Sequence, residues 1–132
     1  MALFDFLKPK WQRSNPQSRI TGIAQLYDQD VLNGLAENDP NQSVRETASK
    51  RLRAEALYRK GKNEMRVGGL KDASLRLLTE AIQADPTHAD AYDARSNVYF
   101  SMDRTDEGMA DMNKSFELLK QQGGKLRGNA IG

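Results

Sequence analysis

Apolar residues recur every three or four positions along most of this chain, which is the spacing of helices that bury one face. From residue 16 onward the pattern predicts six helices, and no segment alternates apolar and polar residues over a length useful for a strand. Pro16 and Pro40 each follow a residue that can cap a helix start. The fold class is therefore expected to be all-α, with helices near 17–27, 29–37, 43–67, 71–84, 88–102 and 105–121.

A short repeat is present in the first part of the chain. The segment 19–26 matches 45–52 at a spacing of 26 residues, with a small residue three positions after the arginine and a leucine seven positions after it. The stretch from Asp39 to Arg45, DPNQSVR, resembles the start of the inner helix in HEAT-like repeats. The resemblance implies that residues 17–53 form HEAT-like helical repeats, a building unit of α-solenoids.

A longer repeat follows over residues 54–121. Leu57 and Tyr92 begin two units 35 residues apart, while Ser74 and Gly108 in their second helices are 34 residues apart. The extra residue is expected in the Gly68-Gly69 turn, where glycine causes little strain. The junction TEAIQADPTHADAY is very similar to that between two tetratricopeptide repeats. This resemblance implies two stacked helix hairpins, although Lys60 and Glu64 replace the usual leucine and aromatic residue of the first unit.

The predicted helix over 43–67 carries two apolar stripes on nearly opposite sides. The first consists of Val44, Ala48, Leu52 and Ala56, and the second of Ala54, Leu57, Tyr58, Gly61 and Met65. A surface helix normally has a single stripe. We therefore expect one continuous helix that ends the first repeat system and begins the second, with a break near 53–55 as the alternative.

Both ends of the chain differ from the helical middle. Residues 1–16 include the apolar run MALFDFLKPKW, which Asp5 interrupts, so it does not have the form of a secretory signal. We expect its aromatic rings to cap the open end of the helical stack, and the alternative is a hook for a membrane surface or a partner. Residues 122–132 are glycine-rich and are expected to form a flexible tail. The absence of an export signal and of cysteine points to the cytoplasm.

Composition excludes several classes of function. The 132 residues contain no Cys, which removes disulfides, thiolate metal sites and cysteine nucleophiles, and a net charge of +2 does not by itself indicate a polyanion partner. No apolar run approaches the roughly 18 residues needed to span a bilayer. His88, the only histidine, is expected to be an exposed structural residue. We therefore expect no enzymatic activity, no metal and no cofactor.

The resemblance to tetratricopeptide repeats also implies where a partner would bind. In such proteins the first helix of each pair lines an inner groove. Carried onto this chain, the groove residues are Glu55, Tyr58, Lys62, Met65, Arg66, Asp90, Asp93, Asn97, Phe100 and Ser101. Some relatives clamp a terminal carboxylate with lysine and asparagine, but Asp93 and Tyr58 stand where lysine is needed, so we do not expect that clamp.

The leading hypothesis is thus a non-catalytic adaptor or scaffold that binds a peptide or protein segment. A self-associating structural protein is the first alternative, because no polar capping helix follows the last repeat and a second copy could pair there. A nucleic-acid accessory protein is a weaker alternative. The basic residues of the helix over 43–67 are scattered around its circumference and interrupted by glutamates, which is typical of a solvated face.

Overall fold

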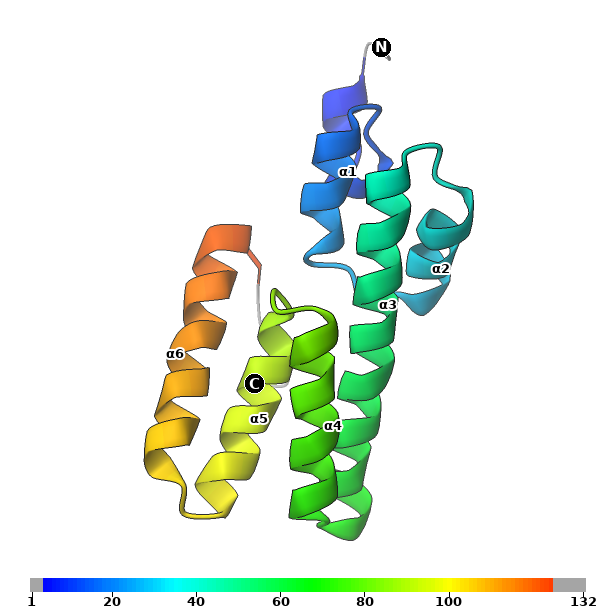
Figure 1. Ribbon diagram of the computed structural model, residues 1–132. Helices are drawn as coiled ribbons and strands as arrows, with labels where there is room; N and C mark the ends of the chain where they lie inside the picture. Colours follow the sequence, from blue (N-terminus) through cyan, green and yellow to red (C-terminus); the bar gives the residue numbers. More distant parts are fainter. Residues whose placement is uncertain (1–3, 125–132) are drawn as a thin grey trace. The chain divides into compact units, whose positions relative to one another are not determined.

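The helices predicted from the sequence are present in the structure. The computed structural model describes residues 4–124, and this range contains six α-helices and no strand, so the all-α class is confirmed (Figure 1). Two 3-10 helices, η1 (Asp5–Leu7) and η2 (Lys10–Gln12), precede them. The α-helices are α1 (Pro16–Ile23), α2 (Gln29–Asn38), α3 (Gln42–Asn63), α4 (Lys71–Ala84), α5 (Ala89–Ser101) and α6 (Thr105–Gln122).

Helix α1 ends four residues earlier than the apolar spacing predicts. The Asp28 side chain caps α2 by accepting hydrogen bonds from the amides of Asp30 and Val31, at 2.9 and 3.2 Å. This cap requires an extended backbone at Asp28, with φ −72° and ψ 112°, so the chain must leave the helical conformation beforehand. Tyr27, the last residue of the predicted helix, lies instead between α1 and α2 and is 49% exposed.

The chain divides into two compact units at a point inside α3. The first comprises residues 1–52 and the second residues 53–132, as far as each is described. Helix α3 runs without a break across this boundary, as the two stripes predicted. Val44 and Ala48 belong to the core of the first unit, and Tyr58 belongs to the core of the second. One helix therefore contributes to two hydrophobic cores.

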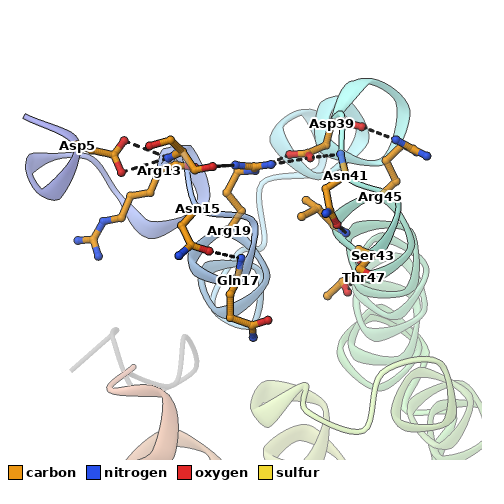
Figure 2. A network of polar contacts seen from close by, with 12 residues as sticks. Asp5, Arg13, Asn15, Gln17, Arg19, Asp39, Asn41, Ser43, Arg45 and Thr47 are labelled. Atoms are coloured by element: carbon orange, nitrogen blue, oxygen red, sulfur yellow. Dashed lines mark hydrogen bonds and ion pairs between the residues drawn. The ribbon is translucent and has the colours of Figure 1, made fainter. Parts of the chain in front are cut away.

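In the first unit, two arginines converge on one aspartate (Figure 2). Arg19 donates two hydrogen bonds to the carboxylate of Asp39, at 2.7 and 3.0 Å, and Arg45 donates to the backbone oxygen of the same residue at 2.7 Å. Arg19 and Arg45 are the two arginines that the 26-residue repeat makes equivalent. Asp39 also caps the turn into α3 by accepting from the amide of Asn41. The hydrophobic core of the same unit consists of Ile23, Leu32, Val44 and Ala48.

In the second unit, α4, α5 and α6 follow one another as neighbouring antiparallel helices (Figure 1). Two glycines allow helices to approach closely. A methyl group added at Gly61 would lie 2.8 Å from the side chain of Leu78, and one added at Gly108 would lie 2.6 Å from the ring of Phe100. Arg95 joins α5 to α6 through two hydrogen bonds to Asp111, at 2.6 and 2.8 Å. The cluster Tyr58, Leu78, Ala81, Ala91, Ala94 and Val98 forms the main core.

A π-helical turn precedes the turn predicted at Gly68-Gly69. A π-helical segment, η3 (Glu64–Gly68), continues directly from α3. Gly69 then adopts the left-handed conformation, with φ 59°, and its amide and that of Leu70 bond back to the carbonyls of Met65 and Glu64. A wider helical turn absorbs one residue without loss of hydrogen bonding. The turn thus begins where the sequence predicts it, and the placement of the extra repeat residue there stays a prediction.

The N-terminal segment does not cap the helices with its phenyl rings. Phe4, Phe6 and Leu7 are 61%, 68% and 70% exposed, so the expected cap is corrected for these residues. Trp11 is half-buried, and its backbone nitrogen lies so close to Gly22 of α1 that a methyl group there would be 2.6 Å away. Among the described residues, no helix is both long and apolar enough to cross a membrane. Most of the predicted tail, residues 125–132, lies outside the described range.

Candidate functional site

A surface pocket opens in the second unit between the end of α3, α4 and α5. Its volume is about 390 Å³, and we call it the α3–α5 pocket. The lining residues come from three helices and from η3: Lys62, Met65, Arg66, Ser74, Leu78, Ala94, Asn97 and Val98. Ser74 donates a hydrogen bond to the backbone oxygen of Gly61 at 2.7 Å, which fixes α4 against α3 beneath the pocket. The pocket is thus formed by helices that pack directly on one another.

The pocket has an apolar floor and a polar, mainly cationic rim. Leu78 and Val98 are buried in its floor, whereas the side chains of Lys62, Arg66 and Asn97 are exposed. An adjoining hollow of about 350 Å³ shares Lys62 and Arg66 with the pocket, and it adds Tyr58, Arg59 and Asn63. The Lys62 ammonium lies 5.4 Å from the centre of the Tyr58 ring. This arrangement suits a ligand with an apolar side chain beside a negative charge.

Acidic residues at the start of α5 provide the opposite charge. Burial raises the pKa of Asp93 above its ordinary value of 3.8, and the charge of Asp90 raises the pKa further, while Lys62 partly offsets both. Asp90 is only 8% exposed, so Asp93, which is partly buried, is the more accessible of the two. The surface around Lys62 is therefore positive toward Arg66 and negative toward Asp93.

A buried Glu55–His88 pair connects α3 to the start of α5. The two side chains have no exposed surface, and His88 Nε2 lies 3.0 Å from Glu55 Oε1. The amide of Ala91 donates to His88 Nδ1 at 3.1 Å, so Nδ1 carries no proton and Nε2 donates to the carboxylate. Arg59 donates to the second oxygen of Glu55 at 2.7 Å. His88 is thus a buried helix cap, which corrects the expectation of an exposed histidine.

The structure brings together some of the groove residues predicted from the repeat resemblance. Four line the α3–α5 pocket, namely Lys62, Met65, Arg66 and Asn97. Tyr58 lines the adjoining hollow, although it is only 4% exposed. These five residues form a continuous surface through the shared Lys62 and Arg66.

The other five lie apart from the pocket lining. Glu55 has no exposed surface and is held inside the protein, and Asp90 is nearly buried. Asp93 lies close enough to Lys62 to feel its charge. The Phe100 ring packs toward Gly108 of α6. Ser101 is exposed, and its backbone oxygen accepts a hydrogen bond from Lys71.

Sequence reasoning did not assign the pocket floor to the site. The floor consists of buried residues, and the spacing of apolar and small residues does not show which buried side chains keep one edge toward the surface. These residues are Ser74, Leu78, Ala94 and Val98. The small side chains of Ser74 and Ala94 are the available signal, because small residues leave space where larger ones would fill it.

Neither a known relative nor a cluster of metal ligands assigns a chemistry to this site. Within residues 4–124, no three His, Asp or Glu side chains gather as metal ligands. Comparisons of the chain with protein-family models, with curated proteins and with solved structures each found no match.

Proposed function

We propose that this chain is a non-catalytic protein-interaction module that works in the cytoplasm and binds a peptide or protein segment in the α3–α5 pocket. The observation that carries the proposal is the combination of an apolar floor with exposed Lys62, Arg66 and Asn97 on the rim. An extended segment with one apolar side chain near acidic residues would fill the floor and pair with the rim. Asn97 could bond the backbone amides of such a segment.

The proposal includes an α-solenoid architecture. HEAT-like helices over 17–53 would be followed by two tetratricopeptide-like units over 54–121. The antiparallel succession of α4, α5 and α6 supports this, as do the close helix contacts at Gly61 and Gly108. Stacked hairpins bury a shared core and leave a concave surface for recognition.

Selection from a displayed library of random peptides, with the full chain as bait, tests the proposal. We expect the selected peptides to combine an apolar residue with acidic ones. Fluorescence anisotropy then compares the wild type with Lys62→Glu/Arg66→Glu, which reverses the rim charge at two exposed positions. Lys60→Glu is the matched control, because Lys60 is also exposed on α3 but lies about 200° around the helix from Lys62.

We expect the double variant to bind the selected peptides at least tenfold more weakly, since two favourable charge pairs become repulsive. Lys60→Glu should bind within about twofold of the wild type. The proposal is rejected if no peptide is enriched, or if the rim variant and the control bind equally well.

Self-association is a second candidate, because α6 exposes two large apolar side chains. Met109 and Phe116 are 43% and 51% exposed, and they lie seven residues apart on one side of the helix. A second copy could cover this face. Light scattering at increasing concentration tests it, and a mass that stays monomeric removes this candidate. If the mass does rise, Phe116→Ser should reverse the increase.

A further inference from the structure

A second surface of interest lies at the N-terminal end, in the first unit. Phe4, Phe6 and Leu7 are each at least 61% exposed, and they fall within four consecutive residues. Exposed apolar side chains are ordinary when they are scattered singly over a surface, but a contiguous group indicates an interaction site. We call residues 4–13 the N-terminal hook.

The exposure of these side chains results from a folded segment with defined contacts. The carboxylate of Asp5 accepts the amide of Ser14 at 3.0 and 3.2 Å (Figure 2). The Arg13 guanidinium donates to the backbone oxygens of Lys8 and Phe6, at 3.0 and 3.3 Å. Arg19 of α1 donates to the backbone oxygens of Arg13 and Ser14, at 2.8 Å each. Hydrogen bonds from polar groups therefore fix the conformation of the hook backbone, and the apolar side chains remain exposed to solvent.

The charges of the hook indicate the kind of partner. Asp5 is the single acid among residues 4–13, and its carboxylate is turned inward to Ser14 and is 3.8 Å from the Lys8 ammonium. Lys8 and Lys10 remain exposed beside the apolar residues. The hook therefore presents apolar and positively charged groups together. Anionic lipid headgroups above an acyl layer have the complementary chemistry, and rings next to lysines are typical of residues at that interface.

We propose that the N-terminal hook binds reversibly to the surface of anionic membranes. Phe4, Phe6 and Leu7 enter the boundary between headgroups and acyl chains, and Lys8 and Lys10 contact the lipid phosphates. Insertion into a fluid interface requires no matching pocket, which fits side chains that project from a short turn. This inference is independent of the proposed peptide pocket, because it rests on residues of the other unit.

Vesicle binding of the full chain tests the inference. Vesicles of pure phosphatidylcholine are compared with vesicles in which one quarter of the lipid is phosphatidylserine, by co-sedimentation at low and high salt. Trp11, the only tryptophan, lies within the hook in η2 and serves as an internal probe. We expect binding to the anionic vesicles at low salt, weaker binding at high salt, and quenching of Trp11 by lipids brominated on their acyl chains.

Matched variants distinguish membrane binding through the hook from nonspecific binding by exposed apolar side chains elsewhere. Phe4→Ser/Phe6→Ser should lower the vesicle partition coefficient at least tenfold, and Lys8→Gln/Lys10→Gln should lower it about fivefold for each lysine removed. Val67→Ser/Leu70→Ser removes two apolar side chains of the other unit that are 70% and 53% exposed, and this variant should bind as the wild type does. Circular dichroism checks that each variant keeps its helices.

Three results would overturn the inference. The first is failure to bind anionic vesicles at low salt, and the second is equal binding to neutral and anionic vesicles. The third is unchanged binding of the Phe4→Ser/Phe6→Ser variant. If the hook residues were needed to form a complex with another protein but the chain did not bind vesicles, the hook would be a protein-binding surface and the membrane assignment would be wrong.

Discussion

Replacing Asp39 by asparagine tests the polar network of the first unit. The Asp39 carboxylate accepts two hydrogen bonds from Arg19 and one from the amide of Asn41, and the Asp39 and Arg19 side chains are 4% and 11% exposed. Hydrogen bonds to a charged group contribute about 1.5–3 kcal/mol each, and breaking a buried ion pair costs about 3–5 kcal/mol. Because asparagine keeps one oxygen acceptor, we expect Asp39→Asn to lower the free energy of unfolding by about 2–4 kcal/mol.

The pH dependence of this effect has a defined sign. Burial acts to raise the pKa of Asp39, but the hydrogen bonds from Arg19 and Asn41 and the charges of Arg19 and Arg45 outweigh it, so the pKa lies below 3.8. A carboxylate with a lowered folded-state pKa adds stability that is complete above its unfolded pKa and lost as the pH falls through the folded value. The difference between wild type and Asp39→Asn should therefore be constant from pH 7 to about 5 and shrink below about 4.

Urea unfolding followed by Trp11 fluorescence provides the measurement, because Trp11 packs next to α1 in the same unit. Glu37→Gln is the matched control. It removes the same charge two residues away, from an exposed position near the end of α2, and should change stability little. A loss below about 0.5 kcal/mol for Asp39→Asn at pH 7, or a loss that does not change between pH 7 and 3, would refute the reasoning.

Four further substitutions test the second unit and the helix interiors. Gly61→Ala should lower the free energy of unfolding in urea by about 1–3 kcal/mol, because the added methyl group meets a buried leucine of α4. Gly34→Ala in α2 is the control, since its methyl group meets nothing within 4 Å and should raise the free energy of unfolding by about 0.5–1 kcal/mol. Similar values for both variants would contradict this. Asp111→Asn should cost about 2–3 kcal/mol, because it weakens the two hydrogen bonds from Arg95 between α5 and α6, and an unchanged thermal midpoint would argue against that link. Glu55→Gln should cost about 2 kcal/mol, since it removes a buried charge that faces two donors, and wild-type stability in calorimetry would show that the charge is dispensable.

The helical organisation could be predicted from the sequence because helix periodicity is a local signal. Position 71 begins and position 84 ends α4 as the pattern indicates. The two stripes of α3 predicted two separate cores, which the structure contains. These features depend on the spacing of apolar residues along one helix, and the amino-acid sequence shows that spacing directly.

Features that depend on contacts between distant residues could not be predicted in the same way. His88 looked exposed because it follows a turn, but Glu55 lies 33 positions earlier and supplies the partner that allows its burial. Phe4 and Phe6 were expected to pack on the ends of the helices. The sequence does not show that Asp5 and Arg13 bond to backbone groups of this segment, which hold it in a turn that leaves the rings exposed. The pocket floor likewise depends on which edge of each core side chain remains uncovered.

The passage of α3 through both units has a consequence for how the chain folds. Starting a helix is unfavourable because several dihedral angles are fixed for the first hydrogen bond, whereas each further residue is added easily. Since α3 runs unbroken from Gln42 to Asn63, whichever unit forms first supplies a nucleus from which the helix can extend into the other. Two cores that share no buried side chains can in this way fold cooperatively, with the backbone of a single helix carrying the coupling.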